Sequence, residues 1–212
     1  MGFLTRGLEF QLGTLHPDQA FVEMNRAFRF SDSARISALG CLNTETLIRS
    51  SQKGEHLREV IEYIEHSLSP RDKLSDTAKL TIIEAAMLLQ NLAWHNGQHL
   101  SEVVLLAGSL LGQTSYPLLA RENAAAALKN AAWYKGKHLL KAIEAVLSSG
   151  FRSPHGSDRI TSECVRVLQY ASRHSKALLR TDTVRKFLEM ASNDTNQTIA
   201  GNAQKTLAAI FG

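Results

Sequence analysis

A repeat of 39 residues constrains the fold of this chain more than any other feature of its sequence. Six residues recur at that offset: Asn91, Ala93, Trp94, Gly97, His99 and Leu100 return as Asn130, Ala132, Trp133, Gly136, His138 and Leu139. A partial earlier copy, Gly-x-His-Leu, begins at Gly54, and a weaker later copy keeps Ala171 and Leu178. Periods of about 20–50 residues are typical of stacked supersecondary units that share one continuous core.

Each copy of the repeat is expected to contain two helices. Apolar residues at helical spacing predict the first helix at 76–95 and 118–134, and the second at 99–112 and 138–150. Weaker patterns predict further helices at 31–51, 55–69, 157–174, 181–192 and 200–212. Asp76 is expected to cap the helix that it begins. The alanine run 124–127 predicts a close approach between helices, because small side chains keep the axes near the short end of about 8–10 Å.

These patterns predict an all-α fold, a right-handed α-solenoid of about four two-helix units with helical caps. The chain of 212 residues, 44% of them apolar, is long enough to bury the core of a single domain over 1–212. The units are expected at 31–69, 70–112, 113–151 and 152–192. Cap helices are expected at 1–30 and at 193–212.

The Gly-x-His-Leu copies are interpreted as helix punctuation. Gly54, Gly97 and Gly136 fall where a first helix must end, and glycine adopts the left-handed backbone of such an end without a steric clash. The histidine two residues later can donate to the carbonyls left open at the end of the preceding helix, where a positive charge is favoured.

A metal site built from these histidines is not expected. Histidines in successive units would lie about 10 Å apart, whereas zinc–nitrogen distances are about 2.1 Å. His95 and His99 are four residues apart, but Gly97 interrupts the helix that would place both on one face. No HExxH glutamate accompanies them. No metal or other cofactor is therefore predicted.

Catalysis and membrane insertion are not expected either. The sequence has no P-loop, no Gly-x-Ser-x-Gly and no dinucleotide glycine pattern, and neither Cys41 nor Cys164 has a neighbouring base. Both cysteines are expected to be buried, reduced thiols. The amino terminus lacks the pattern of a signal peptide, and the apolar stretches are too short to span a membrane. We expect a non-enzymatic chain with no membrane partner and an intracellular location, cytoplasmic or nuclear.

The first helix of each unit resembles the third helix of armadillo repeats. The segments "AAMLLQNLA" (85–93) and "AAAALKNAA" (124–132) follow that helix, which reads roughly Ala-Leu-x-Ala-Leu-x-Asn-Leu-Ala, and "ECVRVLQYA" (163–171) is a degenerate third copy. The resemblance covers about residues 70–180. HEAT repeats, which are two-helix units of similar length, are a close rival for the same residues.

The resemblance to armadillo repeats implies a concave surface on which the family's asparagine hydrogen-bonds the backbone of an extended peptide. That asparagine falls on Asn91 and Asn130, with Gln169 in the third unit. Peptide-binding members often carry a tryptophan four residues earlier, where this sequence has Met87, Ala126 and Val165. Recognition of basic peptides in the manner of importins is therefore not expected. The asparagines could instead form a structural ladder that bonds the turn of the neighbouring unit.

Two tryptophans add to the candidate binding surface. Trp94 and Trp133 lie three residues after the asparagines, roughly one helical turn on, and Tyr134 is adjacent. They are expected either to anchor a partner or to pack between units at the turn. The predicted partner-binding residues are Asn91, Trp94, Asn130, Trp133, Tyr134, Gln169 and Arg173.

The leading functional hypothesis is a protein–protein interaction scaffold or adaptor that binds a peptide or helical segment of another protein on its concave surface. The alternative is nucleic-acid binding by the basic carboxyl-terminal half, since residues 151–212 hold 9 Lys/Arg against 5 Asp/Glu. The cations that would track phosphates are Lys129, Lys135, Lys137, Lys141, Arg166, Arg173, Lys176 and Arg180. Self-association, or continuation of the solenoid in a longer parent chain, is also open.

Overall fold

The computed structural model describes residues 56–68, 75–95, 97, 99–150 and 157–212, with Gln19, Val22, Leu47 and Arg49. The α-helices in these ranges are α5 (Leu57–Ser67), α6 (Asp76–Leu92), α7 (Leu100–Gly112), α8 (Leu118–Ala132), α9 (His138–Gly150), α10 (Asp158–His174), α11 (Asp182–Ser192) and α12 (Gln197–Phe211). One 3-10 turn, η1 (Ala177–Leu179), precedes α11. No strand occurs in the described part of the chain, so the all-α prediction is confirmed there. The predictions for Gly54, for Cys41 and for nearly all of 1–55 concern residues outside the described ranges.

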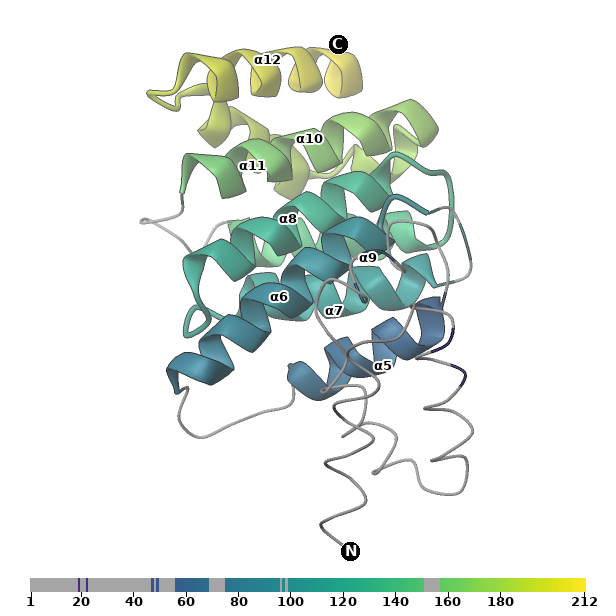
Figure 1. Cartoon of the computed structure of the whole chain (residues 1–212). Coiled ribbons are helices and arrows are strands. Elements are labelled where there is room, and N and C mark those ends of the chain that lie inside the picture. Colours follow the sequence, from purple (N-terminus) through teal and green to yellow (C-terminus); the bar gives the residue numbers. More distant parts are fainter. Residues whose placement is uncertain are drawn as a thin grey trace, which may run out of the picture.

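The helices stack in two layers (Figure 1). In one layer α6 packs on α8, α8 on α10 and α10 on α12, while α5, α7, α9 and α11 follow one another in the second layer. Each helix also contacts a neighbour in the opposite layer. This alternation along the chain is the predicted α-solenoid. The division into units and caps at the residue boundaries given above stays a prediction.

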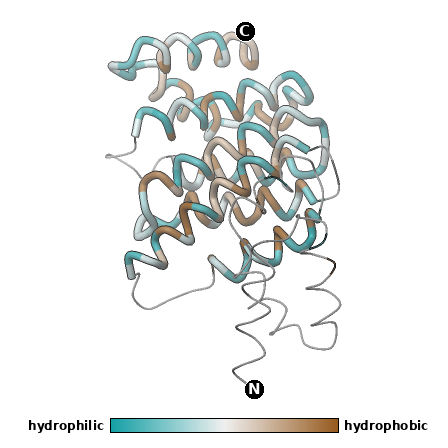
Figure 2. Tube along the Cα trace, viewed as in Figure 1, coloured by the Kyte–Doolittle hydropathy of each residue, from teal (hydrophilic) through white to brown (hydrophobic). Residues whose placement is uncertain are grey.

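Helix α8 is enclosed by α6, α7, α9 and α10. The alanine run 124–127 is no more than 1% exposed at any position. Because an alanine side chain is a single methyl group, four helices can approach α8 closely, as the alanine run predicted. Hydrophobic stretches, brown in Figure 2, run along the helices in the middle of the stack.

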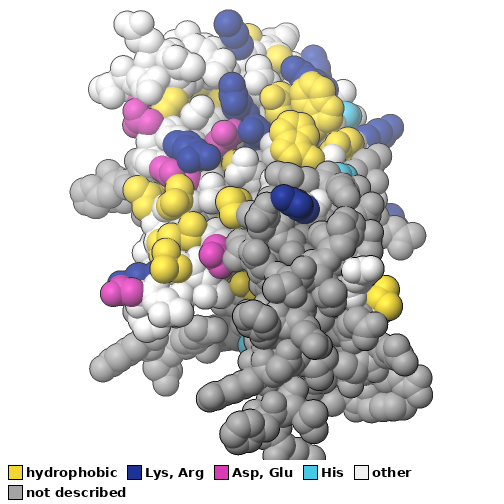
Figure 3. Space-filling view, viewed as in Figure 1, with side chains coloured by type: hydrophobic (Ala, Val, Ile, Leu, Met, Phe, Trp, Pro, Cys, Tyr) yellow, Lys and Arg dark blue, Asp and Glu magenta, His cyan; other side chains and the backbone are white. Residues whose placement is uncertain are grey.

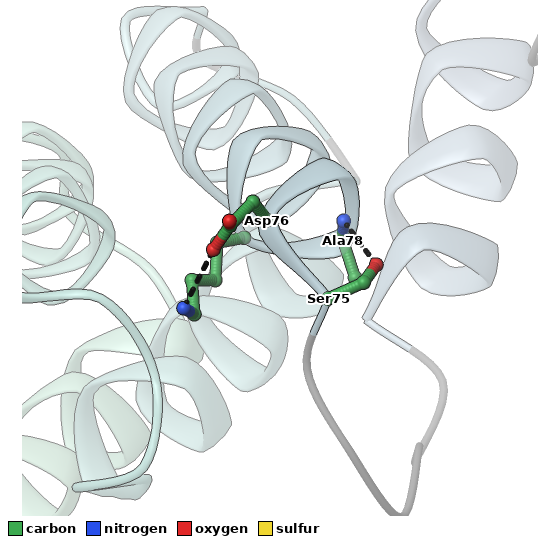
Figure 4. Close-up of polar contacts among 4 residues, drawn as sticks. Ser75, Asp76 and Ala78 are labelled. Carbon is green, nitrogen blue, oxygen red and sulfur yellow. Dashed lines mark hydrogen bonds and ion pairs between the residues drawn. The ribbon is translucent and has the colours of Figure 1, made fainter.

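The N-cap residue of α6 is Ser75, one residue before the predicted cap (Figure 4). Its Oγ accepts a hydrogen bond of 3.2 Å from the backbone N–H of Ala78. Asp76 is the first helical residue, where its charge is favoured by the helix dipole, and it pairs with Lys79 at 2.9 Å. The hydrogen bond from the Lys79 ammonium lowers the pKa of Asp76. The prediction that Asp76 caps the helix is therefore wrong by one position.

The same Ser/Thr-Asp pair begins two later helices. The hydroxyl of Ser157 accepts from the N–H of Ile160 at the start of α10, and that of Thr181 accepts from the N–H of Val184 at the start of α11. A cap of this kind contributes about 1 kcal/mol. These caps fix where each helix begins, and thus the register in which the layers pack.

The Gly-x-His turns use glycine for space, which differs from the predicted left-handed helix end. Neither Gly97 nor Gly136 has a φ in the left-handed region. A Cβ on Gly136 would lie 2.7 Å from Cε1 of His138, and one on Gly97 would lie 2.8 Å from Cε1 of His99. The left-handed conformation occurs instead at His56, with φ 50°, the one such non-glycine residue in the described ranges. Glycine is needed at 97 and 136 because the histidine ring occupies the space of a side chain.

The ring of His138 closes the end of α8. Its Nε2 lies 3.0 Å from the carbonyl oxygen of Ala131 and 3.2 Å from that of Tyr134. Both partners are acceptors, so Nε2 carries the proton and donates, which confirms the predicted role of this histidine. The buried Nε2 of His99 lies near the equivalent carbonyls, of Leu92 and His95, without reaching hydrogen-bond geometry.

We expect Gly136→Ala to lower the free energy of unfolding by about 1–3 kcal/mol, because the new methyl group would overlap the buried His138 ring. Gly201→Ala is the matched control: nothing lies within 4 Å of its Cβ position in α12, so alanine should add about 0.5–1 kcal/mol. Denaturant unfolding of both variants measures the difference. In a His138→Ala background the Gly136→Ala cost should largely disappear. Equal costs in both backgrounds would contradict this account of the glycine.

Burial lowers the pKa of His99, so protonation of this residue favours the unfolded chain. The stability that neutral His99 contributes is complete above its unfolded pKa of about 6.5 and is lost as the pH falls toward the lower folded pKa. We therefore expect His99→Gln to flatten the decrease in Tm between about pH 7 and pH 5. His66→Gln, at an exposed position of α5, is the control. A His99→Gln profile parallel to that of the wild type would refute the expectation.

Candidate functional site

The carboxyl ends of α6, α8 and α10 lie together along one edge of the stack, on the right in Figure 1. The turn after α6 carries Trp94, the turn after α8 carries Trp133 and Tyr134, and the last turn of α10 carries Arg173. Hydrogen bonds from Tyr134 to the carbonyl of Trp94 and from His174 to the carbonyl of Trp133 show that these ends are in contact. Four of the predicted binding residues therefore share one edge.

The two tryptophans are exposed to an unusual degree for this residue type. Trp94 is 54% exposed and Trp133 is 47% exposed. Tryptophan is among the more deeply buried residues on average, whereas about half of the surface of each residue is accessible here. The edge therefore presents two large aromatic surfaces at equivalent positions of the repeat.

Around Trp133 the aromatic surface is built from two helices and a turn. The Trp133 and Tyr170 rings meet edge to face, with centroids 5.0 Å apart and planes at 87°. The guanidinium carbon of Arg173 lies 5.1 Å from the Trp133 centroid and 4.9 Å from the Tyr170 centroid. These are cation–π distances, so the arginine is held against both rings.

Neighbouring helix pairs hold the backbone of both tryptophans. The hydroxyl of Tyr134 donates a short hydrogen bond to the carbonyl of Trp94. Nε2 of His174 lies 2.8 Å from the carbonyl of Trp133 and donates to it. Each indole is thus attached to a turn that the following helix pair clamps. We call the following set of residues the tryptophan edge: Trp94, Trp133, Tyr134, Tyr170, Arg173 and His174.

Tyr170 and His174 are members of this edge that the sequence reasoning did not select. Tyr170 occupies a position where the preceding unit has Ala131, so the repeat gave no signal for it. Its spacing of three residues from Arg173 on a helix was the available signal, since residues three apart lie on one face.

The predicted asparagines are less accessible than the tryptophans. Asn130 is 1% exposed, and its Nδ2 donates to the carbonyl of Gln90 in α6 at 3.1 Å. This bond joins α8 to a carbonyl inside the helix of the neighbouring unit, whereas the predicted structural ladder bonded the turn of that unit. Asn91 and Gln169 are half-buried. Their role in partner binding stays a prediction.

Six of the eight cations predicted for nucleic-acid binding are exposed. Lys129 and Arg166 are exceptions, because both approach Glu163, at 3.3 and 3.9 Å. The exposed cations are Lys135, Lys137, Lys141, Arg173, Lys176 and Arg180. Dark blue Lys and Arg side chains lie beside large hydrophobic side chains at the upper right of Figure 3.

Groups for metal or thiol chemistry do not assemble in the described ranges. No cluster of three or more His, Cys, Asp or Glu side chains there could hold a metal ion. Cys164 is fully buried, and this burial raises the pKa of its thiol to about 12, so it carries no thiolate at neutral pH. Of the helices that the structure describes, none combines the length and the apolar character needed to cross a membrane.

Comparison with known proteins supports the fold. No protein-family model matches the sequence, and no curated protein matches it either. Among solved structures, the chain is similar to the "Designed armadillo repeat protein YIII(Dq)4CqI", with a TM-score of 0.56 and 16% sequence identity over 97% of this chain and 91% of that chain. This likeness confirms an armadillo-like α-solenoid.

Proposed function

We propose that this chain is a non-catalytic interaction scaffold that binds a segment of another protein at the tryptophan edge. The observation that carries the proposal is the pair of half-exposed indoles at equivalent repeat positions, each on a turn clamped by the next helix pair. Tryptophan, tyrosine and arginine are the residues most enriched at energetic hot spots of interfaces. A clamped backbone lowers the entropy that such residues lose on binding.

The edge is better suited to side-chain anchoring than to the backbone recognition implied by the asparagines. Asn130 already donates to Gln90 and is inaccessible, whereas Trp94 and Trp133 expose about half of their surface. Packed helices such as α6 and α8 lie about 8–10 Å apart. About three residues of an extended segment, or two turns of a helix, span that distance. A short apolar motif would therefore contact both indoles.

We expect Trp94→Ala and Trp133→Ala each to weaken binding of peptides selected on this chain from a random displayed library, by about tenfold or more. The Tm should change little, because both rings are about half exposed. Isothermal titration and thermal unfolding of the same samples measure both quantities.

Leu105→Ala is the matched control, since Leu105 is 52% exposed on α7, in the other layer. Its affinity for the same peptides should equal that of the wild type. Selection that yields no specific binder, or binders that both tryptophan variants retain at full affinity, would sink the proposal.

A further inference from the structure

Two stretches beside the tryptophan edge are basic and contain no carboxylate side chain. Residues 133–141 and 166–180 together hold 7 Lys/Arg and no Asp or Glu. The whole chain has 24 Lys/Arg and 20 Asp/Glu, so 17 cations remain against the same 20 acids elsewhere. The excess of positive charge is therefore concentrated in these two stretches, which contain Trp133 and Arg173.

This positive charge is barely compensated from within the described part of the chain. Of the seven cations, Arg166 pairs with Glu163. No ion pair among the described residues involves the other six. Arg180 donates from Nε to the carbonyl of Ile210, a neutral partner. Six exposed cations without an ion-pair partner among the described residues, of which Arg173 lies against Trp133 and Tyr170, favour a ligand of negative charge.

The guanidinium of Arg173 has N–H donors that suit a carboxylate. Its guanidinium carbon lies at cation–π distance from both Trp133 and Tyr170, and no described residue accepts a hydrogen bond from it. Its N–H groups therefore remain available for a carboxylate, which a guanidinium can bind through two parallel hydrogen bonds. Contact with the two rings restrains the side chain before a ligand arrives, which lowers the ordering cost of binding.

Taking the proposed function as its basis, we infer that the segment bound at the tryptophan edge is an acidic peptide. One Asp or Glu carboxylate binds the guanidinium of Arg173, and an adjacent apolar or aromatic side chain packs on Trp133. Lys135, Lys137 and Lys176 attract further carboxylates at longer range. A peptide fits better than a nucleic-acid strand, because a strand needs successive open ring faces on which its bases stack. Here Tyr170 and Trp133 meet each other edge to face and Arg173 lies against both rings, while the exposed half of Trp133 is sufficient for one peptide side chain.

Three labelled probes test this inference by fluorescence anisotropy: a peptide of alternating Glu and Trp, its counterpart with Gln for every Glu, and a single-stranded oligothymidylate of about 20 nucleotides. The Glu peptide should bind about tenfold or more tightly than the Gln peptide, and its affinity should fall as salt rises. Arg173→Gln should weaken the Glu peptide about tenfold and leave the Gln peptide unchanged.

Arg159→Gln provides the matched control, because it removes the same charge from the first turn of α10, at the opposite end of this helix from Arg173. It should bind the Glu peptide like the wild type. Equal affinity for the Glu and Gln peptides, or equal losses from the two arginine variants, would overturn the inference. So would oligothymidylate that binds more tightly than the Glu peptide and displaces it, which would make the edge a nucleic-acid site.

The library selection separates this inference from the proposed function. Selected peptides that depend on Trp133 but lack Asp and Glu, and that tolerate Arg173→Gln, would refute the acidic partner and leave the scaffold function standing. A selection without any specific binder would refute both. Enrichment of acidic residues next to aromatic ones among the binders is the outcome that supports both.

Discussion

The close packing of α8 is the constraint on which the rest of the molecule depends. Four consecutive alanines let this helix contact α6, α7, α9 and α10 at once. Two buried polar side chains of α8 donate to carbonyl oxygens of the neighbouring helices. Asn130 donates through Nδ2 to Gln90 of α6, while its Oδ1 has no partner among the described residues, and Arg121 donates from Nε to the carbonyl of Leu111 at the end of α7. Tight packing thus converts polar side chains into links between helices, which leaves few of them for a partner.

The same constraint explains why the large aromatic rings lie beyond the helix ends. The buried side chains of α6 and α8 are mostly alanine, leucine and isoleucine, and both indoles lie beyond the ends of these helices. Trp94 and Trp133 occupy the turns, and their carbonyls become acceptors for Tyr134 and His174. A ring in that position is supported through its backbone and exposed at its face, which is the combination that a preorganised binding surface requires.

The sequence was sufficient for the architecture because the repeat of 39 residues and the helical periodicity agree with each other. The helix expected over 157–174 is found as Asp158–His174, and the one over 181–192 as Asp182–Ser192. Details decided by side-chain contact were not predictable. A glycine before a turn looks the same whether it adopts a left-handed conformation or makes room for a ring, as Gly136 does for His138.

The candidate site was harder to predict than the fold for two physical reasons. An alanine-rich helix has no apolar stripe, so its sequence does not say which side faces the core, and the burial of Asn130 followed only from the packed structure. Tyr170 entered the edge through contact with Trp133 across two helices, at a position where the repeat carries Ala131. Sites formed between repeat units depend on such unrepeated residues.

The Gly-x-His turn after α8 and the tryptophan edge are joined through Tyr134. The carbonyl of Tyr134 accepts from His138, while the hydroxyl of the same tyrosine donates to Trp94. The Gly-x-His turn thus positions the clamp on the preceding tryptophan. One unit later, His174 still clamps Trp133, but the position equivalent to a tryptophan is Ser172, and the sequence contains no tryptophan beyond these two. The repeat therefore builds an aromatic edge two units long, and Arg173 lies at the end where the aromatic series stops and the acid-free basic stretch begins.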